Sequence, residues 1–278
     1  MRPALVISAV VLAALGLDLT IAPRSTARFF SWPIDPPLTA QTLGAFYLAA
    51  LVILVISIRG WVWARVRVVL PGGIAFSVLA FAATLIHLSK FNFDAPSLFA
   101  RIITWVWTIA YLILPPILLV ALVPQRNEPG TDPPSSPGAV EVRAAMAVLG
   151  ALMVLAAGAL YAVPEQMARI WPWDLTPLTA RAMASWIGGL GLVFVLAARD
   201  GRRDAMAAPA VGLLLVGSFQ IVSLARFGGD VSWGEAGAWL YLALLVAAVA
   251  VGTTGVRQAA RGTSAALSPP ATAVPSSR

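Results

Sequence analysis

Residues 23–40 read PRSTARFFSWPIDPPLTA, and residues 164–180 read PEQMARIWPWDLTPLTA. Both stretches begin with proline, continue through Ala-Arg, Trp-Pro and an aspartate, and end in Pro-Leu-Thr-Ala. The matched residues are Pro23 with Pro164, Arg28 with Arg169, Trp32 with Trp171, Asp35 with Asp174, and Ala40 with Ala180. A match of this density, about 140 residues apart, predicts an internal duplication of the chain.

The composition is that of a protein embedded in a membrane. Hydrophobic residues make up 59% of the chain and charged residues only 11%, whereas soluble domains carry about 25% charged residues. Eight stretches approach the roughly 20 apolar residues that cross a bilayer. These stretches are residues 3–22, 41–58, 68–89, 102–123, 143–163, 182–198, 205–225 and 236–256. We therefore expect an all-α polytopic membrane protein with eight transmembrane helices.

The duplication divides the expected helices into two sets of four. The matched pairs beyond the first loop are Lys90 with Arg226, Asp94 with Asp230, Trp105 with Trp239, and Trp107 with Tyr241. An even number of spans returns the chain to its starting side, so the two four-helix repeats are predicted to be parallel. We expect a first repeat over residues 1–123, a flexible cytoplasmic Pro/Gly/Ser linker over 124–142, a second repeat over 143–256 and a disordered cytoplasmic tail over 257–278.

The sequence also excludes several kinds of site and partner. There is no cysteine and only one histidine, His87, so thiolate and multi-histidine metal sites are excluded, and we expect no metal and no cofactor. The net charge of +7 does not indicate a nucleic-acid partner, because the arginines are spread over short loops and form no patch. Arginine in place of lysine, together with abundant alanine, is typical of a GC-rich bacterial genome.

The distribution of basic residues predicts the orientation in the cell membrane. The side that holds both termini, the linker and the loops at 59–67 and 199–204 carries 12 of the 19 lysine and arginine residues. The opposite side carries the other seven. Because cytoplasmic loops are enriched in Lys and Arg, we expect both termini to be cytoplasmic and both Trp-Pro loops to face outward.

The outward-facing ends hold the candidates for ligand binding. Eight of the ten tryptophans lie there, which indicates either an interfacial aromatic belt or an aromatic vestibule for an apolar ligand such as a lipid tail, isoprenoid or quinone. The charged residues form either structural ion pairs, with Lys90 and Asp94 on one face if the helix continues that far, or a ring for an anionic headgroup. The candidates are Arg28, Trp32, Asp35, His87, Lys90, Asp94, Trp105, Trp107, Arg169, Trp171, Asp174, Arg226, Asp230 and Trp239.

Three further features lie inside or near the spans. Asp18 is the most deeply embedded acid, and it is either a functional intramembrane carboxylate or a partner of Arg24 or Arg28. His87 is either an interfacial hydrogen-bonding residue or a proton acceptor or haem ligand. Pro115-Pro116 is expected to kink and break the fourth span.

Three classes of function remain open. The first is a binding or transport module for an apolar or lipid-like ligand at the outer face, which the duplication and the one-sided aromatic residues favour. The second is an accessory or scaffold subunit that docks a partner membrane protein. The third is a membrane enzyme acting on a lipid-linked substrate, in which Asp35, Asp174, Asp94 or Asp230 would serve as acid or base. Membrane lipids are the expected surroundings in each case, and no residue is assigned a catalytic role.

Overall fold

The computed structural model describes residues 2–59, 63–125 and 135–267, and this part of the chain is helical without β-strands. The long helices are α1 (Arg2–Ile21), α3 (Pro37–Ile58), α5 (Leu70–Ile86), α6 (Leu98–Gln125), α7 (Val140–Ala162), α9 (Pro177–Asp200), α10 (Arg203–Arg226) and α11 (Ala236–Leu267). The short helical turns between them are α2 (Thr26–Phe29), α4 (Trp63–Val66), η2 (Leu88–Lys90), α8 (Pro164–Ala168) and η3 (Gly228–Asp230).

Seven helical segments in the described part are long and apolar enough to cross a membrane, and they are α3, α6, α7, α9, α10, α11 and the stretch Trp63–Ile86, which joins α4 and α5. α1 is apolar between Leu5 and Ile21, slightly less than the roughly 20 residues of a full span. The all-helical, multi-pass character of the chain is therefore as the sequence predicts, whereas the eighth span stays a prediction.

The repeated Pro-Leu-Thr-Ala motif begins the two central helices. Pro37 and Pro177 are the first residues of α3 and α9, where the fixed φ of proline suits a helix start and its missing N–H leaves no bond unmade. Thr176 caps α9 by accepting a hydrogen bond from the Thr179 N–H. α9 ends at Gly201, whose φ of 69° is the left-handed conformation that glycine adopts most easily.

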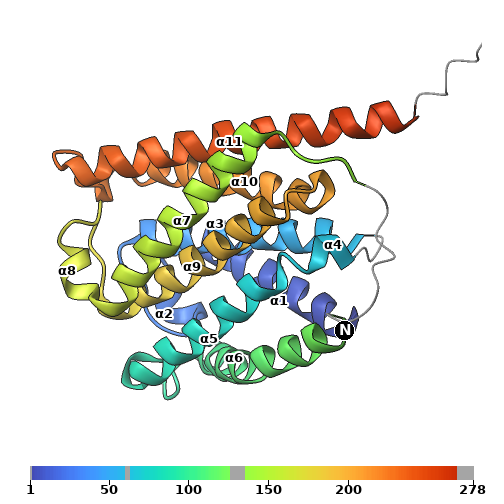
Figure 1. The fold of residues 1–278 in the computed structure, drawn as a ribbon. Coiled ribbons are helices and arrows are strands. Elements are labelled where there is room, and N and C mark those ends of the chain that lie inside the picture. The colour runs from blue at the N-terminus through green and yellow to red at the C-terminus, as the bar shows by residue number, and fades with distance from the viewer. Residues whose placement is uncertain (1, 60–62, 126–134, 268–278) are drawn as a thin grey trace, which may run out of the picture.

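The helices pack as two interleaved sets. α3 and α9 are the most buried spans, touch each other and lie in the middle of the molecule (Figure 1). α3 packs against α1 and α10, while α9 packs against α7 and α5. α6 covers α5, and α11 covers α10. The third helix of each predicted repeat therefore packs on the second helix of the other, so the halves exchange helices and do not form separate bundles.

Glycines allow several close helix crossings, two of which involve α9. Gly72 of α5 faces Gly189, and a Cβ on Gly189 would lie 2.8 Å from the Gly72 carbonyl oxygen. Gly150 of α7 faces Gly191 in the same way, with 2.8 Å from a Cβ on Gly191 to the Gly150 carbonyl oxygen. Helices in membranes pack through such small residues, which explains how α9 accommodates a neighbour on two sides.

The connecting segments gather at the two ends of the bundle (Figure 1). One end, here called the α2/α8 end, holds α2, α8 and the loops that the sequence predicts to face outward. The other, here called the α4 end, holds α4 and the 199–204 turn. There Arg67 Nε donates to Asp200 Oδ2 (3.0 Å) and Arg202 Nε donates to Asp200 Oδ1 (3.1 Å), so one carboxylate joins the α4–α5 segment to the α9–α10 turn.

The segment expected to be a flexible linker, residues 124–142, is ordered in part. Residues 126–134 lie outside the described residues. Beyond them, the Gly138 N–H donates to the Gly201 carbonyl oxygen (2.9 Å) and the Arg203 N–H donates to the Ser136 carbonyl oxygen (3.0 Å). These bonds hold residues 135–139 against the 199–204 turn, and α7 begins directly afterwards at Val140.

Two further expectations about local structure are corrected. The tail expected to be disordered over 257–278 is helical as far as Leu267, because its first part is rich in alanine, the strongest helix former, and holds no proline. Residues 268–278 lie outside the described residues. α6 is one helix from Leu98 to Gln125, including Pro115-Pro116, so the predicted break is wrong. Prolines are tolerated in membrane helices where neighbouring groups satisfy the freed carbonyls.

Candidate functional site

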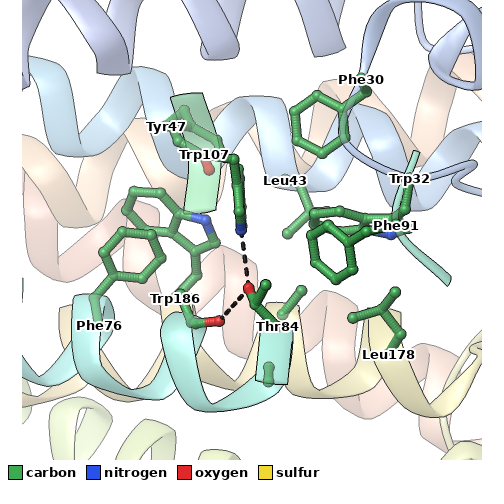
Figure 2. Close-up of a pocket in the computed structure, with 13 residues that line it drawn as sticks. Phe30, Trp32, Leu43, Tyr47, Phe76, Thr84, Phe91, Trp107, Leu178 and Trp186 are labelled. Atoms are coloured by element: carbon green, nitrogen blue, oxygen red, sulfur yellow. Dashed lines mark hydrogen bonds between the residues drawn. The ribbon is translucent and has the colours of Figure 1, made fainter. Parts of the chain in front are cut away.

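Eight aromatic side chains form a continuous first aromatic cluster that extends from the α2/α8 end into the bundle, and all of them except Tyr111 are drawn in Figure 2. Its members are Phe30, Trp32, Tyr47, Phe76, Phe91, Trp107, Tyr111 and Trp186. The ring centroids of Trp107 lie 5.1 Å from those of Trp32 and 4.5 Å from those of Tyr111. Most pairs meet edge to face, the arrangement that the aromatic quadrupole favours. Trp186 comes from α9, so the cluster joins both predicted repeats.

The first cluster is a packed core and leaves almost no space. Trp107 Nε1 donates to Thr84 Oγ1 at 3.0 Å, the upper dashed line in Figure 2, and the hydroxyl oxygens of Tyr47 and Tyr111 are 3.0 Å apart. The cavity that remains measures about 10 Å³, the space of about one water molecule. Trp32 Nε1 has no hydrogen-bond partner among the described residues. The candidates Trp32 and Trp107 thus lie inside this core and not at the wall of an open vestibule.

A second, smaller aromatic cluster lies beside α7, α10 and α11. The ring centroids of Trp171, Trp173 and Tyr241 are 5.4–5.8 Å apart. Trp173 Nε1 donates to Thr39 Oγ1 at 2.9 Å, which ties this loop to the start of α3. Trp171 Nε1 is buried and has no hydrogen-bond partner in the described part of the chain.

The second cluster borders a cavity of about 150 Å³, here called cavity A. Its walls come from α3, α7, α9, α10 and α11 and include Phe46, Leu149, Ile187, Leu213, Leu245 and Ala248. Gln220 of α10 also lines it, although this side chain is only 1% exposed. Gln220 Nε2 donates to the Thr42 carbonyl oxygen at 3.1 Å. Gln220 Oε1 has no hydrogen-bond partner within residues 2–59, 63–125 and 135–267.

A further cavity of about 110 Å³, here called cavity B, lies between α1, α3, α5, α6 and α9. Its walls are apolar apart from two serines and include the glycine crossing of α5 and α9. One of those serines, Ser77, donates to the Gly73 carbonyl oxygen at 2.6 Å. Cavity B therefore suits an apolar group and presents little that would orient a polar one.

The charged candidates lie on the surface of the α2/α8 end and make no ion pairs with one another in the described structure. The exposed ones are Arg28, Asp35, Lys90, Asp94, Arg169 and Asp174. The helical spacing expected for Lys90 and Asp94 is wrong, because α5 ends at Ile86, Lys90 closes the turn η2, and Phe91 is extended. Among the described residues, the ion pairs are those of Asp200 with Arg67 and Arg202, at the α4 end.

Arg226 and Asp230 connect the second half of the chain to the first. Arg226 Nη1 donates to the Thr20 carbonyl oxygen (3.0 Å) and to Gln41 Oε1 (2.9 Å). The Leu38 N–H donates to Asp230 Oδ2 at 3.3 Å. These two candidates thus bind the last turn of α1 and the first turn of α3, which gives them a structural role at the α2/α8 end.

His87 pairs with an arginine that is absent from the candidates predicted by sequence. Arg181 Nη1 donates to His87 Nε2 at 2.8 Å, and Arg181 Nε donates to the Tyr161 carbonyl oxygen at 3.2 Å. Burial lowers the pKa of His87 below 6.5, and the nearby Arg181 guanidinium lowers it further. Because a neutral imidazole can accept from a guanidinium, His87 is a hydrogen-bonding residue that joins α5 to the first turn of α9.

The remaining candidates are Trp105, Trp239 and Asp18. Trp105 is 55% and Trp239 is 58% exposed, as expected for aromatic residues at a membrane interface. Asp18 is half-buried in α1, and its carboxylate makes no ion pair with a described residue. No three His, Cys, Asp or Glu side chains of the described residues come together in a way that could hold a metal ion.

Gln220 is the residue of this site that the sequence-based candidates lack. A lone amide deep within an apolar span is itself a signal, because a buried polar group needs a hydrogen-bond partner. Sequence alone does not place it beside Trp171, which lies in a loop 49 positions earlier in the chain. No protein-family model, curated protein or solved structure matches this chain.

Proposed function

We propose that this chain is an integral membrane protein that binds an apolar, lipid-like ligand within its helix bundle. The observation that carries the proposal is cavity A, whose volume of about 150 Å³ equals that of an apolar cavity known to bind benzene in another protein. Leu152 of α7 and Leu244 of α11 line this cavity and are 46% and 37% exposed. The cavity therefore reaches the lipid-facing surface between α7 and α11, and a ligand enters it from the bilayer.

The bundle around the cavity consists of two parallel four-helix repeats. Equivalent backbone bonds support this arrangement. The Asn92 N–H donates to the Ser31 carbonyl oxygen, and the Ser232 N–H donates to the Pro172 carbonyl oxygen, each at 2.8 Å. In each case the loop after the third helix is tied to the Trp-Pro loop before the second.

The same contacts favour a slightly different register from the one read off the sequence. Trp32 packs on Trp107 and Trp173 packs on Tyr241, at ring-centroid distances of 5.1 and 5.4 Å. This makes Trp173, and not Trp171, the counterpart of Trp32. In this register Arg28 precedes Trp32 by four positions, as Arg169 precedes Trp173, and the two loops differ by one residue before Pro-Leu-Thr-Ala.

The two repeats differ in side-chain size at matched positions around the α3–α9 pair. The first cluster has Tyr47, Trp107, Tyr111 and Trp186, and the matched positions beside cavity A hold Ile187, Tyr241, Leu245 and Phe46. Each of the four residues in the second set is smaller, and all four line cavity A. This difference in side-chain size accounts for about 10 Å³ of free space beside the first cluster and about 150 Å³ in cavity A. It therefore favours cavity A as the site of ligand binding.

Both termini are cytoplasmic, and the α2/α8 end faces outward, as the count of basic residues favours. Gln220 lies six residues before the end of α10 at Arg226, a distance of about 9 Å along a helix. The polar part of cavity A is then in the outer half of the membrane. This location agrees with a ligand that is taken up or presented at the outer face.

The test is mass spectrometry of the full chain extracted directly from its native membrane into nanodiscs. We expect one apolar molecule in stoichiometric amount, and we expect its loss when the cavity is filled by Ala248→Leu. The control is Ala250→Leu on the same helix, where the side chain is exposed to lipid. A stoichiometric protein without a small molecule would instead favour the accessory-subunit role and contradict the proposal.

A further inference from the structure

Two buried polar atoms at cavity A lack partners, and they are of opposite kinds. Gln220 Oε1 can only accept a hydrogen bond, and Trp171 Nε1 can only donate one. Neither has a partner in the described structure, and both side chains line the same cavity. Buried polar groups in native proteins are nearly always paired, so each such atom indicates a partner that is supplied from elsewhere.

The orientation of the Gln220 amide follows from its other contact. The Thr42 carbonyl oxygen is an acceptor, so the group 3.1 Å from it must be the amide nitrogen. A reversed amide would place two acceptors against each other. Gln220 Oε1 is therefore the unpaired atom, and the unmet requirement is for a donor.

The first aromatic cluster offers a comparison, because there a side chain of the protein itself pairs a buried tryptophan N–H. Thr84 of α5 accepts from Trp107 Nε1 at 3.0 Å. Trp32 Nε1 is unpaired there, but the adjoining space of about 10 Å³ suits one water molecule. Cavity A combines an unpaired donor, an unpaired acceptor and room for a much larger molecule.

We propose that cavity A binds the hydroxyl end of an apolar alcohol or phenol that is dissolved in the membrane. The hydroxyl oxygen accepts from Trp171 Nε1, and the hydroxyl proton is donated to Gln220 Oε1. One hydroxyl meets both requirements, whereas a ketone or ester carbonyl can only accept and leaves Gln220 unpaired. This inference rests on the proposed function and names the ligand class of the same site.

The remaining walls define the rest of the ligand. No charged side chain of the described residues lines cavity A, so a carboxylate or phosphate would be buried there without a counter-charge. The ring or chain next to the hydroxyl packs against apolar side chains such as Leu149 and Leu213. A longer tail leaves between Leu152 and Leu244 and lies in the lipid.

The test compares two probes that differ by one hydroxyl, 4-fluorophenol and fluorobenzene. Both are close to benzene in size and therefore fit a cavity of this volume. Binding to the full chain in phosphatidylcholine nanodiscs is measured by ¹⁹F NMR, with empty nanodiscs as the reference for partition into lipid. We expect the protein to bind 4-fluorophenol about tenfold more tightly than fluorobenzene after this correction, as hydrogen bonds in a dry site imply.

Three variants assign the preference to the two atoms. Gln220→Met and Trp171→Phe each remove one partner and should reduce the preference to about threefold or less, while fluorobenzene binds as before. Fluorobenzene binding reports that the cavity is intact, which matters because Gln220→Met also removes the bond to Thr42. Trp105→Phe is the matched control at an exposed tryptophan, and it should leave both affinities unchanged.

The outcomes separate this inference from the proposed function. Equal affinity for both probes means that ordered water satisfies the two atoms, which overturns the hydroxyl assignment but leaves an apolar binding site. A preference that survives both variants places the phenol elsewhere and also overturns the assignment. If neither probe binds above empty nanodiscs, the hydroxyl site and the proposed function both fail.

Discussion

Replacing Gly189 by alanine should weaken the bundle at the close crossing between α5 and α9. The added Cβ would lie 2.8 Å from the Gly72 carbonyl oxygen and 2.8 Å from Phe76 Cβ. Ordinary contacts begin at 3.4 Å, so the helices must separate by about 0.6 Å. Neither neighbouring atom can rotate away, because one belongs to the backbone and the other is fixed to it.

The expected cost follows from two opposing effects. Overpacking a close-packed site costs about 1–3 kcal/mol, and we expect the upper part of this range because two fixed atoms are met at once. Alanine in place of glycine within a helix stabilises the folded state by about 1 kcal/mol. The free energy of unfolding of Gly189→Ala should therefore fall by about 1–2 kcal/mol.

Gly158 of α7 is the matched control. A Cβ there meets nothing within 4 Å, so Gly158→Ala keeps the helix-propensity gain of about 1 kcal/mol without a clash. Both variants are unfolded reversibly by sodium dodecyl sulfate in mixed micelles, with far-UV circular dichroism as the readout. If Gly189→Ala proves as stable as Gly158→Ala, the helices do not approach as closely as described, and the reasoning is refuted.

Three other expectations concern two hydrogen-bonded pairs and the orientation of the chain. Burial and the nearby Arg181 guanidinium lower the pKa of His87 in the folded protein. The unfolded chain therefore binds the proton first, and stability falls as the pH drops below about 6.5. Unfolding of His87→Gln should show a weaker fall, and an equal fall would contradict the lowered pKa. Tyr47→Phe and Tyr111→Phe should each lower the free energy of unfolding by about 1–2 kcal/mol. The double variant should lower it by less than the sum of the two, because it leaves no unpaired hydroxyl. Strictly additive effects would argue against a hydrogen bond between the two tyrosines. A reporter that is active only in the cytoplasm should be active when it is fused at Gly130. If only a reporter that requires the extracellular side is active at this position, the predicted orientation is wrong.

The positions of the helices could be predicted from the sequence because hydropathy decides them. Backbone groups in a bilayer have no water to bond, so long apolar stretches must be helical. The expected span 41–58 is found as Pro37–Ile58, and 205–225 is found as Arg203–Arg226. The prediction of a disordered tail is wrong as far as Leu267, because the helix propensity of alanine extends α11 beyond the apolar stretch.

The candidate site could be predicted only in part, because it depends on which helices exchange partners. The sequence pattern pairs Trp32 with Trp171, although the ring contacts pair Trp32 with Trp173. Trp32 lies beside a cavity of about 10 Å³, and Trp171 lies beside one of about 150 Å³. The difference arises from Trp186, which reaches the first cluster because α5 packs on α9. Sequence spacing holds no information on that crossing, which the glycine contacts at Gly72 and Gly189 determine.

The asymmetry between the two proposed repeats has an energetic consequence. The first cluster stabilises the bundle by burying large aromatic side chains, whereas an empty cavity A of about 150 Å³ costs about 3–4 kcal/mol at roughly 24 cal/mol per Å³. The two unpaired atoms, Gln220 Oε1 and Trp171 Nε1, add to that cost. A ligand that fills the space and pairs both atoms offsets these terms and stabilises the folded chain in proportion to its occupancy. In the proposed duplication, one half maintains the fold while the other keeps an open site for the proposed ligand.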